Sequence, residues 1–477
     1  MAEPPLLYRA LRAVVRTLMR VFFRDITVAG RRNVPEAGGG LLVAWHPNGV
    51  IDPALILSTF PGQIVFGARH GLLKWPLLGA LMRGLGTVPI YRAQDAGTTD
   101  PEARRAANEK SLGALADQIA AGSFSALFPE GVSHDDPSLR DVKTGAARLY
   151  LRARAEAAAS ETPPVIVPVG LHYDDKDLFR SDVLVAYHPP LRLGDLPEGD
   201  GEETVRALTG RIEAALVEAV RPTEDWQTHR LMHRAYALMR AEDDVRDGVD
   251  SGPATFEDRT RGFRMVWHGY QARRDSHPQE IEALRRDVAA YDRLLRTTGL
   301  ADADLDRPPE VASPLLVALF LVQLAAVAIL LPPVIVLGFV VNLPAFWLLN
   351  RAARRFAAAE KDTATVKILG GIVLYPLAWT IAAVLAGLGA ARLHDLFPAL
   401  PDAPLLAGVA VFVLSALGGA MALRWGELVK ETSRAVRARF FRRRRRDVIA
   451  RLQLLRTDLH ARFSRLAEGL DLPESVV

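Results

Sequence analysis

A block of long, nearly uncharged hydrophobic segments lies between Pro314 and Leu423, and it limits the possible folds more than any other feature. Residues 315–331 and 334–349 are almost wholly apolar and are separated by two prolines, Pro332 and Pro333. As helices, each is roughly 25 Å long, against a bilayer core of about 30 Å. The pair therefore forms either two short spans or a re-entrant hairpin. A purely soluble, disordered or fibrous protein is excluded.

Two clearer membrane spans follow, at about 368–391 and 404–423. Lysine and arginine are concentrated in the loop 351–367 and in the stretch 434–446, whereas the loop 392–403 mixes one arginine with two aspartates. The positive-inside rule then predicts a multi-pass protein of the cell membrane, with an even number of crossings and both termini in the cytoplasm. The arginine-rich stretch directly follows a span, so it favours contact with anionic lipid over nucleic-acid binding.

The N-terminal segment, residues 1–30, has a different relation to the membrane. Its arginines recur three or four residues apart, which places them on one helical stripe, at positions 9, 12, 16, 20 and 24. Leucines, valines and phenylalanine fill the opposite side. The pattern predicts an amphipathic membrane-docking helix in the bilayer plane, with its arginines toward anionic head groups. An ordinary helix packed on its own domain is the alternative.

The water-soluble part begins with an α/β domain, residues 31–200. Short β-rich runs alternate there with helical stretches such as 101–121, which is typical of α/β folds. The expected strands are 41–45, 64–67, 88–91, 124–128, 165–170 and 183–188. Residues 201–310 form a helical appendage, 311–425 the transmembrane region of about four hydrophobic segments, and 426–477 a basic cytoplasmic amphipathic helix. The sequence has no cysteine, which excludes disulfides, thiolate zinc sites and a cysteine nucleophile.

Candidate chemistry lies in the α/β domain. In the stretch AWHPNGVIDP, His46 comes just after a buried strand, and Asp52 follows where a helix is expected to begin. A carboxylate on the first helical turn can bond one nitrogen of the imidazole and leave the other free as a base. Other patterns are weaker. His229 and His233 have the spacing of a zinc helix but lack its glutamate, so surface histidines are expected.

Three further blocks accompany this pair in order along the chain: GTVPIYR ending in Arg92, LFPEGVSHD with Glu130 and Gly131, and VIVPVGL. Together the four blocks resemble the glycerolipid acyltransferase superfamily. The five residues between His46 and Asp52, and the stretch KTGAA with Lys143, resemble the fungal glycerol-3-phosphate/dihydroxyacetone-phosphate acyltransferases and their bacterial relatives. Val-Ser-His at 132–134 departs from the Thr-Arg-Ser of many relatives.

The resemblance implies transfer of a fatty acyl group from acyl-CoA or acyl carrier protein to glycerol 3-phosphate or 1-acylglycerol 3-phosphate. His46 would act as general base and Asp52 would fix its tautomer. Arg92 and Lys143 would bind the acceptor phosphate, helped by backbone N–H groups near Gly131. Glu130 would orient the acceptor hydroxyls or Arg92. No metal and no cofactor beyond the acyl donor are expected. A lipid esterase and a non-catalytic lipid-binding membrane protein are the alternatives.

Overall fold

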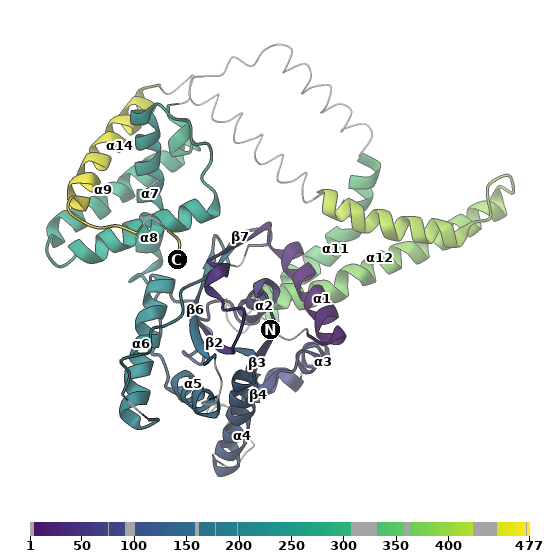
Figure 1. The fold of residues 1–477 in the computed structure, drawn as a ribbon. Coiled ribbons are helices and arrows are strands. Elements are labelled where there is room, and N and C mark those ends of the chain that lie inside the picture. Colours follow the sequence, from purple (N-terminus) through teal and green to yellow (C-terminus); the bar gives the residue numbers. More distant parts are fainter. Residues whose placement is uncertain are drawn as a thin grey trace.

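The computed structural model describes residues 4–74, 76–90, 101–157, 162–176, 178–197, 199–306, 332–356, 363–422, 446–473 and 475–477. These residues form an α/β domain, a helical bundle and a group of long apolar helices (Figure 1). This architecture confirms the predicted α/β domain followed by helical and apolar regions. Short 3₁₀ turns lie at Arg31–Asn33, His70–Lys74 and Asp302–Asp304.

The α/β domain is built on a seven-stranded sheet in the order β1-β7-β6-β2-β5-β3-β4. All neighbouring pairs are parallel except β6 and β7, which are antiparallel. The strands are β1 Asp25–Ala29, β2 Gly40–Ala44, β3 Ile64–Arg69, β4 Val88–Ile90, β5 Phe124–Leu127, β6 Val165–Tyr173 and β7 Asp182–Tyr187. The six strands expected from the sequence are present.

Helices cover both faces of this sheet, and each face has its own hydrophobic core. On one face lie α1 (Leu6–Phe22) and α2 (Ile51–Thr59), with α3 (Pro76–Gly84) beside α1. The other face is covered by three helices, α4 Pro101–Ala120, α5 Gly145–Glu156 and α6 Glu202–Val220. The central strands are apolar on both sides because both sides are buried. Because β2 to β6 run parallel to one another, their carboxyl ends meet at one edge of the sheet.

The strand β1 was missed by the sequence analysis, which assigned residues 1–30 to a docking helix. The helix ends at Phe22, and β1 pairs with β7 in parallel from Asp25 to Ala29. Its sequence, DITVA, is short and begins with an exposed aspartate, so its pattern is weak. Pairing with the fully buried β7 stabilises it as an edge strand.

The helical bundle consists of α7 (Trp226–Asp247), α8 (Phe256–Arg273), α9 (Pro278–Thr298) and α14 (Arg446–Ala467). Leucines of α14 pack in one core with leucines of α7 and α9. The sequence analysis divided the segment 426–477 from the helical appendage at 201–310. In the structure α14 belongs to the same bundle as that appendage, although about 150 residues of chain separate them (Figure 1).

Within the described residues, three helices are long and apolar enough to cross a membrane: α11 (Pro332–Phe356), α12 (Thr363–Leu396) and a helix over 404–422. Asn342 links them, because its amide donates to Ser415 O at 3.0 Å and accepts from Trp379 Nε1 at 2.8 Å. The expected segment 315–331 and most of the arginine-rich stretch 434–446 lie outside the described residues.

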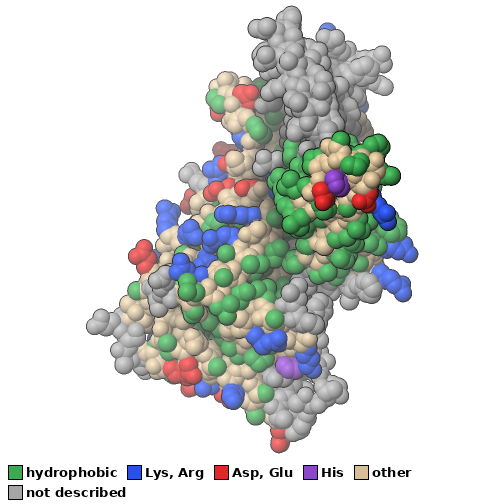
Figure 2. Space-filling view, turned by 90° about the vertical axis from the view of Figure 1, so that its right-hand side faces the viewer, with side chains coloured by type: hydrophobic (Ala, Val, Ile, Leu, Met, Phe, Trp, Pro, Cys, Tyr) green, Lys and Arg blue, Asp and Glu red, His purple; other side chains and the backbone are tan. Residues whose placement is uncertain are grey.

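The apolar helices and α1 present hydrophobic surface on the same side of the molecule. Figure 2 shows the helical hairpin of α12 and 404–422 nearly end-on, with hydrophobic side chains along its sides and charged side chains at its tip. Hydrophobic side chains also gather on the neighbouring face of the α/β domain, where α1 and α3 lie (Figures 1 and 2). On α1 the exposed apolar residues include Leu6, Leu7, Val14 and Val21.

Candidate active site

His46 lies at the carboxyl end of β2, just beyond Ala44. The preceding residue, Trp45, is buried and its indole N–H donates to Leu171 O on β6 at 3.0 Å, which fixes where the strand ends. The imidazole of His46 stacks on Phe128, with ring centroids 4.1 Å apart. The ring is therefore held on one face by an aromatic side chain and on its backbone side by the sheet.

Asp52 reaches His46 although five residues separate them. Helix α2 begins at Ile51, so Asp52 lies in its first turn, where a negative charge is favoured by the helix dipole. Its Oδ2 is 2.8 Å from His46 Nδ1 and also accepts the Asn48 N–H at 2.8 Å. The carboxylate is fully buried. The loop 46–50 thus turns back on itself, and the histidine and aspartate meet as the sequence pattern suggested.

Tyr173 completes this arrangement and was missed by the sequence analysis. Its hydroxyl donates to Asp52 Oδ1, so each carboxylate oxygen has a partner. Burial and the adjacent Asp52 charge raise the pKa of Tyr173 well above its ordinary value, so the hydroxyl stays protonated. Tyr173 ends β6, which continues past the end of β2 at Ala44. The tyrosine directly follows the apolar VIVPVGL block and one histidine, which is the only trace of its role in the sequence.

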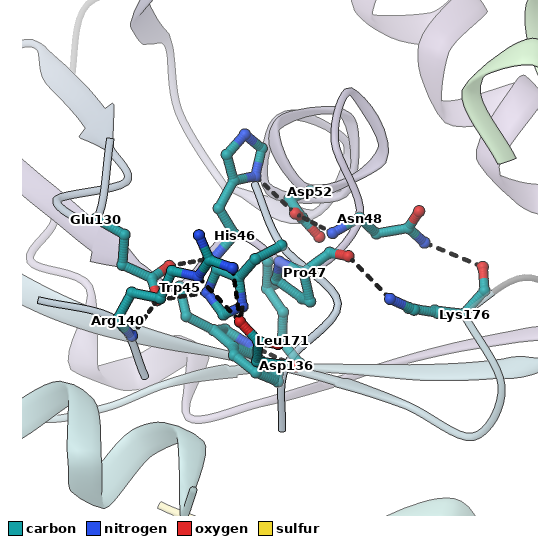
Figure 3. A network of polar contacts seen from close by, with 11 residues as sticks. Trp45, His46, Pro47, Asn48, Asp52, Glu130, Asp136, Arg140, Leu171 and Lys176 are labelled. Carbon is teal, nitrogen blue, oxygen red and sulfur yellow. Dashed lines mark hydrogen bonds and ion pairs between the residues drawn. The ribbon is translucent and has the colours of Figure 1, made fainter. Parts of the chain in front are cut away.

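The second imidazole nitrogen, His46 Nε2, points away from this network (Figure 3). A carboxylate can only accept, so Nδ1 carries the hydrogen of the neutral ring and Nε2 presents a lone pair. Among the described residues no side chain or backbone group bonds Nε2. With 14% of the side chain exposed, the ring is accessible to a small hydroxyl group. This is the arrangement that a general base requires.

Glu130 holds the His46 segment from the other side (Figure 3). It is 1% exposed, its Oε2 accepts the His46 N–H at 3.0 Å, and its Oε1 lies 2.6 Å from His134 Nε2. Oε1 also accepts the Arg140 N–H at 3.0 Å. The sequence analysis expected Glu130 to orient the acceptor. Both of its oxygens are instead occupied inside the protein, so its contacts position the backbone of His46.

Arg92, Lys143 and the backbone near Gly131 were expected to bind the acceptor phosphate. The Gly131 N–H donates to Phe128 O at 2.9 Å, so it is not available to a phosphate in this conformation. Gly131 has a positive φ of 72°, and a Cβ there would lie 2.9 Å from Lys143 Nζ. The exposed Lys143 ammonium group therefore lies beside the loop that carries Glu130. Arg92 lies outside the described residues.

The arginines of α1 do not form one lipid-facing stripe. Arg12 donates to the carbonyls of Leu57, Phe60 and Gly62, and Arg16 donates to Ser58 O at 3.2 Å. These carbonyls lie at and just beyond the C-terminal end of α2, where cations are favoured. The two arginines thus support the helix whose first turn carries Asp52. The exposed surface of α1 is largely apolar instead.

His229 and His233 were expected on a helix surface, but both pack against Phe263, with ring centroids 4.5 and 4.6 Å from its ring. Burial is the main cause that lowers the pKa of His229 to about 4 and of His233 to about 3. In the part of the chain that the structure describes, no group of three or more metal-binding side chains is close enough to hold an ion.

Two family models match the chain. The acyltransferase model covers residues 25–172, which include β1 to β6 and the His46–Asp52 pair. The model of the glycerol-3-phosphate acyltransferase 2 C-terminal domain covers residues 263–474. The first match thus places an acyltransferase domain around the His46–Asp52 pair. The second match extends the likeness to glycerol-3-phosphate acyltransferases through the apolar helices to α14.

Among similar proteins, glycerol-3-phosphate O-acyltransferase 2 of Saccharomyces cerevisiae is 29% identical over 388 residues, covering 60% of this chain and 50% of the yeast protein. Glycerol-3-phosphate O-acyltransferase 1 of the same yeast is 25% identical over 487 residues, covering 83% of this chain and 61% of that yeast protein. The chain thus spans about half to three-fifths of the length of these relatives.

A crystal structure of the 1-acyl-sn-glycerophosphate acyltransferase PlsC from Thermotoga maritima is also similar, at 18% sequence identity. The match covers 45% of this chain and 78% of that one, with a TM-score of 0.33. This value is too low to carry structural detail from one protein to the other.

Proposed function

We propose that this protein is a membrane-bound enzyme that moves a fatty acyl group from an acyl thioester to a hydroxyl of glycerol 3-phosphate. The observation that supports it most is the 2.8 Å contact between His46 Nδ1 and Asp52 Oδ2, which leaves Nε2 as a base. The names of the two yeast relatives favour glycerol 3-phosphate as acceptor. Its monoacylated product, 1-acylglycerol 3-phosphate, is the alternative acceptor of the same chemistry.

The reaction needs one proton transfer in each direction. His46 Nε2 takes the proton of the acceptor hydroxyl as its oxygen attacks the thioester carbonyl carbon. The carbon–sulfur bond then breaks, and the leaving thiolate takes the proton from the imidazolium, so that an ester and a free thiol result. Asp52 stabilises the imidazolium through Nδ1–H, as the aspartate does in a serine-protease triad. No acyl-enzyme intermediate is required, because the thioester is already activated.

Glu130 and Tyr173 act as positioning residues in this proposal. Glu130 holds the His46 N–H, and Tyr173 holds the second oxygen of Asp52, so that base and carboxylate keep their mutual orientation. The acceptor phosphate is bound by cations, for which Lys143 and Arg92 are the candidates. Lys143 is exposed beside the Glu130 loop, where a polar substrate can reach it.

The proposed membrane arrangement places both termini and the α/β domain in the cytoplasm. Three arginines, Arg351, Arg354 and Arg355, gather at the end of α11, whereas the tip between α12 and the next helix mixes Arg392 with aspartates. This asymmetry follows the positive-inside rule. The exposed apolar face of α1 lies on the same side of the molecule as the apolar helices, so it docks on the cytoplasmic leaflet (Figures 1 and 2).

The function is tested by incubating the purified chain in lipid nanodiscs with labelled acyl-CoA or acyl carrier protein and with each acceptor in turn. We expect ester formation with glycerol 3-phosphate. Ester formation with 1-acylglycerol 3-phosphate instead would assign the alternative acceptor. Release of free fatty acid alone would indicate an esterase, and no turnover with any pair would indicate a lipid-binding protein. Lys143→Ala and Arg92→Ala should raise the KM for the acceptor more than that for the acyl donor.

The docking of α1 is tested on a chain in which a flexible linker replaces residues 311–425, so that the apolar helices are lost and α14 stays in the bundle. We expect it to float with anionic vesicles and to be released by Val14→Glu combined with Val21→Glu, because both side chains are exposed. Ala214→Glu combined with Ala290→Glu, at exposed positions of α6 and α9, adds the same charge away from α1 and is the control. Arg12 and Arg16 are unsuitable for this test, since they bond the end of α2. Equal flotation of the Val14→Glu, Val21→Glu variant would assign docking to another surface.

A further inference from the structure

The helical bundle contains a cavity far from His46 in the fold. It has a volume of about 140 Å³ and lies between α7, α8, α9 and α14. Its wall is formed largely by hydrophobic side chains, including Met232, Met239, Met265, Val288, Phe463 and Leu472. A pocket with so apolar a lining favours the apolar part of a ligand, because removing apolar surface from water is favourable. Unbranched methionine side chains adapt readily to chains of different shape.

Gly269 on α8 is part of this wall, and the space in front of it is open. A Cβ at Gly269 would meet no atom within 4 Å beyond its own surroundings in the helix. Glycine in a helix interior destabilises the helix relative to alanine. By contrast, Gly262, two turns earlier on the same face of α8, packs against the ring of Tyr236, which would lie 2.1 Å from a Cβ. The room at Gly269 therefore belongs to the cavity and not to a close helix contact.

A second, basic pocket adjoins the apolar one, and the two share Leu284 and Leu466 as a common wall. Its volume is about 500 Å³, and its lining includes Arg273, Arg462 and Arg465 together with His277, Gln279 and Glu280. Two apolar leucines thus separate a hydrophobic compartment from a polar one. An elongated ligand with one apolar and one polar end matches this pair of compartments.

The charge of the basic pocket is not fully compensated by the protein. Arg462 is paired with Asp287 at 2.7 Å and with Asp458 at 3.6 Å. Arg273 donates instead to the carbonyls of Leu466 and Glu468, and Arg465 donates to Ala461 O at 3.4 Å. Within the described residues, neither Arg273 nor Arg465 has a carboxylate within 4 Å. Both guanidinium groups can therefore bond an anion without breaking an ion pair, and guanidinium groups are well suited to phosphate.

We propose that these two compartments form a second lipid site, which binds one long-chain acyl amphiphile that carries a phosphate group. The end of the acyl chain occupies the apolar cavity, and the phosphate lies beside Arg273 and Arg465. The cavity volume corresponds to roughly five times the 30 Å³ that one water fills in the liquid, so it holds only part of a chain. Acyl-CoA and 1-acylglycerol 3-phosphate share this chemistry. The site is separate from His46 and does not depend on the proposed reaction.

Photo-crosslinking of the full chain in phosphatidylcholine nanodiscs tests the site. The probes are 1-acylglycerol 3-phosphate and acyl-CoA, each with a photoreactive group near the end of its acyl chain. We expect labelled peptides from α7, α9 and α14, containing Met232, Leu284 or Phe463. Whichever probe labels these peptides more strongly at equal concentration identifies the source of the ligand. Labelling confined to the apolar helices and the α/β domain would overturn the proposal.

Two variants and two controls sharpen the result. Gly269→Leu fills the cavity and should reduce labelling of the bundle at least fivefold, whereas Gly210→Leu at an exposed, equally open glycine of α6 should not. Arg465→Glu, at an exposed position, should reduce labelling by the phosphate-bearing probes at least threefold and leave that by a neutral monoacylglycerol probe unchanged. If both variants label like the original chain, no such site exists. Equal melting temperatures establish that Arg465→Glu remains folded, even if Gly269→Leu does not.

Discussion

The α/β domain and the helical bundle each contain a buried network of charged side chains, and the two networks differ in one respect. In the α/β domain, Asp52 and Glu130 bond His46 and its neighbours through all four of their carboxylate oxygens. The network nevertheless ends at His46 Nε2, which has no bond among the described residues and faces a partly exposed surface. Its buried part therefore holds one reactive atom in place.

The network of the bundle has no such open end. Arg456 is 1% exposed and lies 2.9 Å from Glu242 Oε2 and 2.6 Å from Asp306 Oδ2. Arg234 bridges Asp292 at 2.7 Å and Asp302 at 2.5 Å. Each guanidinium contacts two carboxylates, and the group joins α7 and α9 to α14. A network closed in this way fixes the packing of helices, whereas an open one presents a functional group.

The difference predicts that substitutions in the two networks have different effects, with loss of activity in the α/β domain and loss of stability in the bundle. His46→Ala and Asp52→Asn should each lower kcat by about 10³-fold or more, because base and orienting carboxylate act as a unit. Melting temperature and membrane attachment should stay close to those of the original chain. His394→Ala, near the exposed end of α12, is the matched control. Near-normal turnover of His46→Ala would remove His46 from the mechanism.

Cutting the closed network should affect stability instead. Arg456→Leu leaves Glu242 and Asp306 without their buried cation, and loss of one partner of a buried ion pair typically costs about 3–5 kcal/mol. We expect a large drop in melting temperature, with kcat per folded molecule retained below the transition. Arg451→Leu, exposed on the same helix, should change little. A loss of kcat without a loss of stability would mean that the bundle takes part in catalysis.

The sequence predicted those parts of this comparison that depend on local pattern. Hydrophobic runs identified six strands and the three described apolar helices, and the spacing of His46 and Asp52 identified the central pair. Contacts between distant segments were not predictable in this way. The bundle needs α14 to return across about 150 residues, and a helical wheel of α1 shows an arginine stripe without showing that Arg12 and Arg16 face α2.

The same reason explains what was missed at the site. Glu130 was singled out by its motif, but its side chain reaches the backbone of His46 across 84 residues, which no periodicity reveals. Tyr173 contacts Asp52 only because β6 continues past β2 and then presents its hydroxyl at the sheet edge. Glu130 and Tyr173 hold the His46–Asp52 pair in place and do not bond His46 Nε2. Residues of this kind can be identified once the strands are aligned in the sheet.

Tyr173→Phe tests whether Tyr173 acts by holding Asp52 in place. Without the hydroxyl, Asp52 Oδ1 loses its partner and the carboxylate can rotate away from His46. We expect kcat to fall about tenfold, equivalent to about 1.4 kcal/mol, with little change in KM. In an Asp52→Asn background the same substitution should have almost no further effect. Tyr150→Phe, which removes a buried bond to Pro164 O on the other face of the sheet, should leave kcat unchanged. Additive losses would show that Tyr173 acts independently of Asp52.

The smallest expected effect concerns a buried polar group that belongs to neither network. His188 is 5% exposed at the end of β7, and its Nε2 has no partner among the described residues. Burial, and then the nearby charges of Arg221 and Arg264, lower the pKa of His188 to about 3. In the unfolded chain a histidine has a pKa of about 6.5. Below that pH the unfolded state binds a proton that the folded state does not, so stability falls as the pH decreases from 6.5 toward 3.

This single group should cost about 1 kcal/mol of unfolding free energy at pH 5.5 relative to pH 7. His188→Gln cannot take up the proton, so its loss of stability between the two pH values should be smaller by that amount. His277→Gln, at the surface of the bundle, should lose as much as the original chain. Urea unfolding followed by tryptophan fluorescence at both pH values measures the difference. An unchanged pH dependence in His188→Gln would mean that His188 is protonated inside the folded protein. A carboxylate or solvent would then have to contact His188, as Asp52 contacts His46.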